Sequence, residues 1–149
     1  MLEKLTYEDL NDLKDIIQEN IHRCGVGSRT SVEYIIATLQ LGMMNENVAF
    51  WTDDKEEPTM LLVMSGFKNI ILNETTAIIN SIFVRDEEDP DLVSKVNLMI
   101  DTAEAYARQK SCDAIMGASW VYKGGKNIQS LWKDKGYEPQ EYHNVKLLK

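Results

Sequence analysis

Cysteine and histidine are scarce in this chain of 149 residues, which has two of each. Cys24 and Cys112 are far apart and lack CxxC spacing, a pattern that favours reduced, buried thiols over a disulfide or a metal site. His22 and His143 add no cluster of metal ligands. We therefore expect neither a disulfide framework nor a bound metal.

Long hydrophobic runs are also missing. The longest uninterrupted apolar stretch, residues 60–64, is far too short to span a bilayer, and the N-terminus lacks a basic-then-apolar signal pattern. The composition, with 44% hydrophobic and 27% charged residues, is ordinary for a folded chain, and no repeat or linker is visible. We expect one cytoplasmic domain over residues 1–149, without a membrane partner.

Positive charge is in short supply. Sixteen Lys and Arg residues stand against 24 Asp and Glu residues, for a formal net charge of −8. Binding to nucleic acid depends on Lys and Arg residues that displace counterions from phosphates. Nucleic acid is therefore not expected as a partner, and solubility is the simplest role for the acidity.

Glycine is absent from the segment 84–91, between a strand-like and a helix-like run, where an α/β fold often binds phosphate. Such a turn needs glycines, so that backbone N–H groups can approach the anion at the start of the helix. This segment instead carries five acids: Asp86, Glu87, Glu88, Asp89 and Asp91. The same acids would suit the helix dipole, which is the simpler explanation of their presence.

Two helices are predicted at the start of the chain. Apolar residues at three- and four-residue steps indicate a first helix over 6–22, and Thr6 with Asp9 resembles a capping box. A second helix is predicted from residue 30 or 31 to about residue 42. A β-hairpin of 48–52 and 59–65 follows, and Gly66 is expected to end or bulge its second strand.

The second half alternates strands and helices. Residues 75–84 are rich in β-branched side chains and predict a central strand buried on both faces. A helical stripe over 92–110 and a strand over 113–119 complete a right-handed crossover with parallel strands. A short helix at 127–135 and a closing strand at 142–148 end an α/β chain with a mixed sheet.

This order of elements resembles the GNAT superfamily of N-acetyltransferases over nearly the whole chain. Leu5-Thr6 with Asp9-Leu10 is similar to the family's opening, and the heptad from Leu131 to Tyr137 looks like its Leu-Tyr-(three residues)-Gly-Phe signature. The resemblance implies an α/β (α+β) fold: a mixed, mostly antiparallel central sheet flanked by helices, with one parallel strand-helix-strand crossover.

Three departures from the family pattern concern the ligand. The family's Arg-Gly-x-Gly-x-Gly turn, which holds the pyrophosphate of acetyl-CoA, falls on non-matching residues: Asp89 at the arginine, and Pro90, Leu92 and Ser94 at the glycines. Proline removes a donor, and leucine is expected to place a side chain where phosphate should lie. Trp132 replaces the tyrosine that often serves as general acid, and Gly125 replaces a common asparagine.

The leading hypothesis is a GNAT-like domain that has lost acetyl-CoA binding, needs no cofactor and acts as an interaction or structural component with a protein partner. Inactive-looking GNAT relatives occur among bacteriophage proteins, so a phage origin is suspected, with the protein in the host cytoplasm or the virion. Exposed aromatic residues would suit such a role, although each is more often part of a core: Trp51, Trp120, Tyr122 and Trp132.

Two alternatives remain open. The first is an active acyltransferase that holds acetyl-CoA through the loop Lys123, Gly124, Gly125 and Lys126, with its site where strand 75–84 and strand 113–119 diverge. Its candidate catalytic and positioning residues are Ser81, Asn80, Ser119, Tyr122 and, at the beginning of the central strand, Glu74. The second is an acidic mimic of nucleic acid, which would form a salt-dependent complex with a DNA-binding protein.

Overall fold

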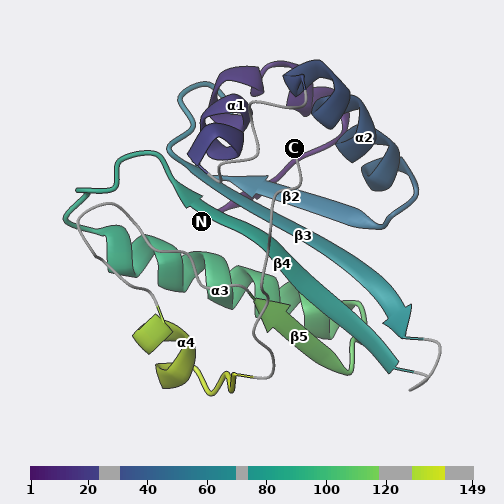
Figure 1. Cartoon of the computed structure of the whole chain (residues 1–149), viewed down its shortest axis with the longest axis vertical. Coiled ribbons are helices and arrows are strands. Elements are labelled where there is room, and N and C mark those ends of the chain that lie inside the picture. Colours follow the sequence, from purple (N-terminus) through teal and green to yellow (C-terminus); the bar gives the residue numbers. More distant parts are fainter. Residues whose placement is uncertain (24–30, 70–73, 118–128, 140–149) are drawn as a thin grey trace, which may run out of the picture. The chain divides into compact units, whose positions relative to one another are not determined.

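The computed structural model describes residues 1–23, 31–69, 74–117 and 129–139. The chain divides into two compact units, Met1–Ala118 and Ser119–Lys149, and each is described by itself. The first unit contains β1 (Glu3–Lys4), the 3-10 helix η1 (Glu8–Asn11), α1 (Lys14–Arg23), α2 (Val32–Met44), β2 (Val48–Thr52), β3 (Met60–Asn69), β4 (Glu74–Val84), α3 (Leu92–Gln109) and β5 (Ala114–Gly117) (Figure 1). The second contains α4 (Gln129–Asp134).

The five strands of the described residues form one mixed sheet in the order β1-β2-β3-β4-β5. The first four strands pair antiparallel with their neighbours, and β5 pairs in parallel with β4 after the crossover through α3. This is the mixed, mostly antiparallel sheet with one parallel crossover that the sequence predicts.

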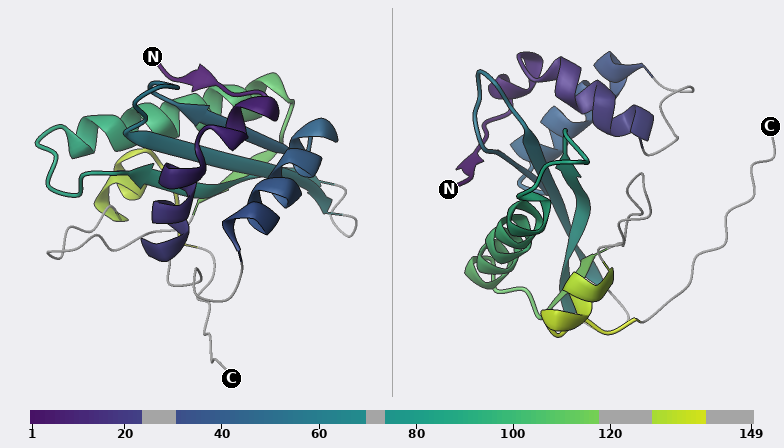
Figure 2. Two further views of the ribbon diagram at one scale, coloured as in Figure 1. Left: turned by 90° about the horizontal axis from the view of Figure 1, so that it is seen from above. Right: turned by 90° about the vertical axis from the view of Figure 1, so that its left-hand side faces the viewer.

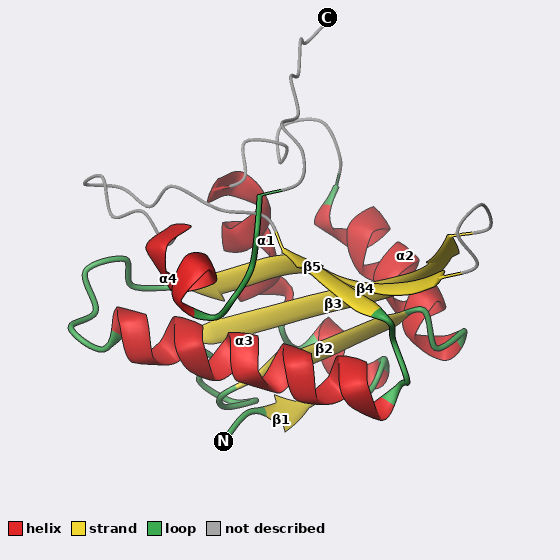
Figure 3. Ribbon diagram, turned by 90° about the horizontal axis from the view of Figure 1, so that it is seen from below, coloured by secondary structure: helices red, strands yellow, loops and turns green. Residues whose placement is uncertain are grey.

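Helices cover both faces of the sheet in the first unit. Figures 2 and 3 show α1 and α2 on one face and α3 on the other. Successive side chains of a strand point to opposite faces of the sheet, so they face the two helical layers in turn. Leu61 and Val63 of β3 belong to the core under α1 and α2, while Leu62 between them is also buried and points to the other face.

The prediction of one continuous helix over 6–22 is wrong. The chain forms η1, leaves helical geometry, and only then begins α1 at Lys14. The capping pair is present: the Thr6 amide and hydroxyl both donate to Asp9 Oδ2, at 2.7 and 3.0 Å. These hydrogen bonds hold the pKa of Asp9 below its ordinary value, with the Thr6 amide as the largest cause. The pair therefore stabilises a short 3-10 turn rather than the start of a long helix.

The predicted hairpin strand 59–65 is too short. β3 continues through Gly66 to Asn69, and β4 begins at Glu74, so that the two strands pair over ten positions. Gly66 pairs with Ala77 inside this ladder instead of ending the strand. A Cβ there would meet its nearest atom, the Thr76 carbonyl oxygen, at 4.0 Å, so no close contact requires glycine.

A β-bulge interrupts the β3–β4 ladder. Val63 pairs with Ser81 and Met64 pairs with Ile79, which leaves Asn80 as the extra residue. An extra residue exchanges the two faces of a strand. Ile79 and Ser81, two positions apart, consequently lie on opposite faces of β4 instead of sharing one, and both are buried.

The second unit is described over residues 129–139. Gly136, with φ of 83°, ends α4 by a Schellman arrangement, in which its amide donates to Lys133 O and the Tyr137 amide donates to Trp132 O. The rings of Trp132 and Tyr137 pack edge to face with centroids 4.8 Å apart. The predicted helix 127–135 is thus confirmed in its centre, and the predicted strand 142–148 lies outside the described residues.

Candidate functional site

Among the described residues, the parallel β4–β5 ladder covers only part of β4. The β4–β5 ladder runs from Thr76 with Ala114 to Ile79 with Gly117, whereas β4 continues to Val84. The bulged residue Asn80 is exposed and lies where this ladder ends. Bulges commonly redirect side chains next to functional sites. The predicted divergence of the two strands would fall beyond Gly117, outside the described residues, so it stays a prediction.

Ser81, the first catalytic candidate, is engaged in the structure. It is 8% exposed, donates to Asn20 Oδ1 of α1 at 3.1 Å and accepts from Asn20 Nδ2 at 2.9 Å. The role considered for Ser81 is to position an amine or a water. Its one hydroxyl donor and one of its acceptor sites are taken by Asn20, and this pair holds α1 to the sheet.

Of the other candidates, the structure describes Asn80, which directly precedes Ser81, and Glu74. Glu74 begins β4 and pairs with Asn69, at the end of the strand remote from the predicted divergence. Ser119, Tyr122 and the glycine-lysine loop at 123–126 lie outside the described residues. Within the described ranges, no group of three His, Cys, Asp or Glu residues could hold a metal ion.

The segment Asp86–Asp91, here called the acidic turn, joins β4 to α3 and uses its own backbone donors. The Glu88 amide donates to Asp86 Oδ1 at 3.0 Å, and the Asp91 amide donates to Asp89 Oδ1 at 2.7 Å. The amides of Asp89 and Leu92 donate to carbonyl oxygens of Asp86 and Asp89. Since Pro90 has no N–H, every amide from Glu88 to Leu92 is occupied within the turn.

Two acids of the turn contact cations from other elements. Asp89 Oδ2 lies 2.5 Å from Lys95 Nζ in the second turn of α3, and this hydrogen bond is the largest cause of a raised pKa for Lys95. Glu87 Oε1 lies 3.0 Å from Nε of Arg23, at the end of α1. Three further acids of the turn remain exposed: Asp86, Glu88 and Asp91.

Arg23 was not identified from the sequence, yet it fastens the end of β4. Its guanidinium donates to Val84 O at 2.6 Å and to Arg85 O at 2.8 Å, and it lies 4.3 Å from the centre of the Phe83 ring. These contacts join residues about sixty positions apart, and no local motif marks them. The last turn of α1 thus holds the chain where the acidic turn begins.

Arg85, which directly precedes the acidic turn in the sequence, also contacts other groups of the protein. It makes a bidentate ion pair with Glu19 of α1 at 2.9 and 3.0 Å and donates to Pro58 O at 3.1 Å. Its amide donates to Thr59 O, which ties β4 to the β2–β3 turn. A bidentate arginine-carboxylate pair is directional and leaves little of the guanidinium for another anion.

Leu92 differs from the expectation that its side chain would lie in the path of a phosphate. It is 4% exposed and belongs to the core, as do other apolar residues of α3. Ser94, the last of the non-matching positions, is exposed on the first turn of α3. The bulk of Leu92 is therefore in the core, and a ligand at this turn would meet the turn's amides and carboxylates instead.

The aromatic residues considered as exposed interface anchors are not exposed where they are described. Trp51 and Trp132 are each 5% exposed. Trp51 packs edge to face against Tyr106 of α3, with ring centroids 4.9 Å apart. Trp120 and Tyr122 lie outside the described residues.

Similar solved structures share this architecture. A predicted acetyltransferase with acetyl-CoA from Clostridium acetobutylicum matches at a TM-score of 0.75 and 13% identity, over 99% of this chain and 96% of that one. The fold is that of the GNAT acetyltransferases. A GCN5-related N-acetyltransferase from Ralstonia eutropha JMP134 matches at a TM-score of 0.69 and 9% identity, over 99% of this chain and 97% of that one. A ribosomal-protein-alanine N-acetyltransferase from Brucella melitensis biovar Abortus 2308 matches at a TM-score of 0.67 and 10% identity, over 99% of this chain and 98% of that one. No family model matches the GNAT-fold chain, and no curated protein matches it.

Proposed function

We propose that this GNAT-fold protein has lost the binding of acetyl-CoA at its β4–α3 turn and acts as a non-catalytic interaction or structural component. One observation carries the proposal: the amides from Glu88 to Leu92 donate to the turn's own carboxylates and carbonyls. A pyrophosphate would have to displace these acceptors before it could bind the amides.

Charge adds to this argument. At roughly 8 Å in water, each exposed carboxylate would repel one phosphate charge by about 0.5 kcal/mol. Asp86, Glu88 and Asp91 are exposed around the turn. The cations nearby, Arg23, Arg85 and Lys95, already contact carboxylates of the protein. The turn therefore opposes an anionic ligand both by hydrogen bonding and by charge.

The test is a calorimetric titration of the full chain with acetyl-CoA at low and moderate salt. We expect no binding heat up to about 1 mM acetyl-CoA. This result would mean that the binding free energy is weaker than about −4 kcal/mol. The triple variant Asp86→Ala/Asp89→Gly/Pro90→Gly releases the amides of Glu88 and Asp91, adds one at position 90 and frees Lys95. Acetyl-CoA binding should appear in this variant, and micromolar binding by the natural sequence would refute the proposal.

A second candidate is an active N-acetyltransferase with an atypical pyrophosphate loop. Its support is the exposed bulge at Asn80, beside the last described pair of the β4–β5 ladder, together with the fold shared with a predicted acetyltransferase with acetyl-CoA. In this candidate the loop 123–126 would hold the phosphates. The same titration separates the two, because this candidate requires binding by the natural sequence that Lys123→Ala/Lys126→Ala abolishes.

The setting of an interaction role stays a prediction. Three hypotheses rest on the sequence alone: a location in a phage particle or the host cytoplasm, a protein partner, and the mimicry of nucleic acid. In the part of the chain that the structure describes, no helix is long and apolar enough to cross a membrane. Pull-down of partners at low and high salt would test the mimic, which requires a salt-sensitive complex with a DNA-binding protein.

A further inference from the structure

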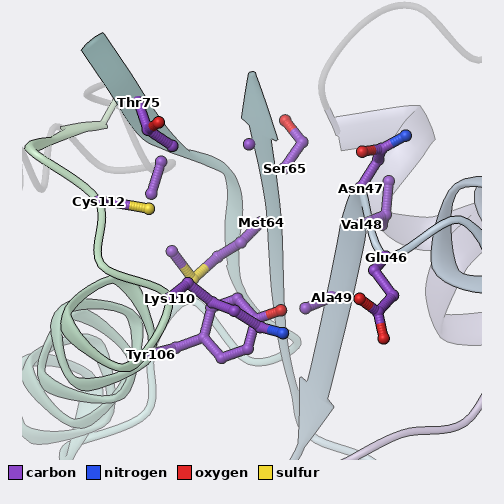
Figure 4. A pocket seen from close by; sticks show the side chains of 12 residues that line it. Glu46, Asn47, Val48, Ala49, Met64, Ser65, Thr75, Tyr106, Lys110 and Cys112 are labelled. Carbon is purple, nitrogen blue, oxygen red and sulfur yellow. The ribbon is translucent and has the colours of Figure 1, made fainter. Parts of the chain in front are cut away.

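A pocket of about 280 Å³ lies at the end of β4 remote from the acidic turn (Figure 4). Its walls come from the α2–β2 turn, the adjoining parts of β2, β3 and β4, and the end of α3. The volume is near the small end of the range for ligand sites, about 300–1,000 Å³. All of these walls belong to the first unit.

The floor of the pocket is apolar and the walls are polar. Ala49, Met64 and Ala77 line it and are each at most 4% exposed. Ser65, Thr75 and Tyr106 add hydroxyl groups from three elements. The pocket thus offers an apolar base and several hydroxyl groups, as small-molecule sites do.

Two opposite charges stand at the pocket. Lys110 is the residue that follows α3, and Glu46 lies in the α2–β2 turn. Both line the pocket and are exposed. In Figure 4 the Lys110 side chain lies over the Tyr106 ring, on the α3 side of the pocket, and Glu46 lies on the β2 side. Lys110 Nζ lies 5.7 Å from the centre of the Tyr106 ring. The two charges therefore come from different walls of the pocket, the end of α3 and the α2–β2 turn.

The backbone beside both charges is in an unusual conformation. Glu46 has φ of 58° and Ser111, which follows Lys110, has φ of 55°. Non-glycine residues pay of order 1 kcal/mol for the left-handed region, and they cluster at ligand sites. These two turns bring Glu46, Lys110 and Cys112 to the same pocket.

We propose that this pocket binds the zwitterion of a small α-amino acid with an apolar side chain. Glu46 faces the ligand's ammonium group, Lys110 and the Tyr106 hydroxyl face its carboxylate, and Met64 with Ala77 receives its side chain. A ligand with one charge would meet one favourable and one unfavourable group, so that both charges are needed. The site is independent of the proposed function, because it lies at the opposite end of β4 and uses none of the acidic turn.

The experiment is an amide-resolved NMR titration of the full chain with leucine, 4-methylpentanoate and 3-methylbutylamine. The last two probes lack the ammonium and the carboxylate, respectively. We expect leucine to shift the amides of Glu46, Ser65 and Lys110 with a dissociation constant of about 1 mM, typical of a ligand with so few atoms. The two singly charged probes should bind at least tenfold more weakly.

Charge variants make the test specific. Glu46→Gln and Lys110→Met should each weaken leucine at least tenfold, and Glu46→Gln should also strengthen 4-methylpentanoate, because it removes a repulsive charge. Glu56→Gln and Lys14→Met are matched controls outside the pocket and should leave leucine binding unchanged. No saturable shift up to about 20 mM leucine, roughly twenty times the expected constant, or equal binding of the three probes would overturn the proposal.

Discussion

Arg23 illustrates how one side chain can hold several parts of a chain together. It bonds two consecutive carbonyl groups at the end of β4, faces Glu87 and covers the Phe83 ring. The side chain of Glu87 is 10% exposed, so loss of its cation would leave a carboxylate largely buried. Nothing near Arg23 in the sequence indicates these contacts, because their partners come about sixty residues later.

Substitution Arg23→Met should therefore destabilise the protein. We expect a loss of about 1–3 kcal/mol in the free energy of unfolding, from two lost hydrogen bonds and an unfavourable carboxylate. Urea unfolding followed by circular dichroism measures it. Arg108→Met is the control, since Arg108 is 75% exposed and pairs only across one helical turn with Glu104. The control should change stability by less than about 0.5 kcal/mol, and equal effects would contradict the role of Arg23.

Asp53 gives a second prediction at the residue scale. Burial would raise its pKa, but donation from the Thr59 hydroxyl and the amides of Thr59 and Met60 outweighs burial and holds the pKa below its ordinary value of 3.8. A depressed folded pKa stabilises the protein above the unfolded pKa, and this stability is lost as pH falls through the folded pKa.

The variant Asp53→Asn should accordingly be less stable than the natural sequence at pH 7, by about 1–3 kcal/mol. The difference should shrink as the pH falls below the ordinary value of 3.8. Urea unfolding of both proteins across the acid range measures it. A difference that is constant with pH would mean that shape, and not charge, makes Asp53 important.

At the scale of elements, the strongest predictions came from long periodic segments. The stripe over 92–110 matches α3 (Leu92–Gln109), and the β-branched run over 75–84 matches β4 (Glu74–Val84). Breaks and register were less predictable. The bulge at Asn80 and the gap between η1 and α1 depend on contacts across the sheet and on the Thr6–Asp9 pair, which local propensity does not report.

Gly42 shows a packing constraint between two elements. A Cβ at this position of α2 would lie 2.5 Å from Cγ2 of Val48, a β-branched residue with little rotamer freedom. Gly42→Ala should gain up to about 1 kcal/mol of helix propensity but lose more to overlap, for a net destabilisation of about 1–2 kcal/mol.

The double variant tests the cause. Val48→Ala makes room for the new methyl group, so Gly42→Ala should be neutral or stabilising in that background. Thermal or urea unfolding of the four proteins of the cycle gives the coupling energy. A Gly42→Ala effect that is unchanged by Val48→Ala would place the conflict elsewhere in α2.

At the scale of the whole molecule, the sequence predicted the GNAT architecture but not which functional groups would be available. The order of helices and strands follows from periodicity, which resides in the sequence itself. Ser81 looked available for catalysis, whereas Asn20 of α1 occupies it. The pocket beside Tyr106 was missed, since its lining residues come from segments that are far apart in the sequence and share no motif.

The net charge of −8 also acts on the molecule as a whole. Three acids of the acidic turn are exposed, so that repulsion opposes the folded state at low ionic strength. Raising NaCl from about 10 to 150 mM shortens the screening length from about 30 to 8 Å and should stabilise the protein by about 0.5–1 kcal/mol in urea unfolding. A fall in stability would show that the screened ion pairs, such as Arg23 with Glu87, outweigh the repulsion.

The strand order has a consequence for folding. From β2 to β4, consecutive strands of the chain pair with each other through short connections. Such a meander can grow by successive local additions as the chain leaves the ribosome, at a small entropic cost for each loop. The parallel strand β5 cannot join until α3 has formed and crossed the sheet. The edge of β4 that receives β5 is therefore the last part of this sheet to be covered, and the interval before β5 docks is when a newly made chain is most exposed to pairing with another copy.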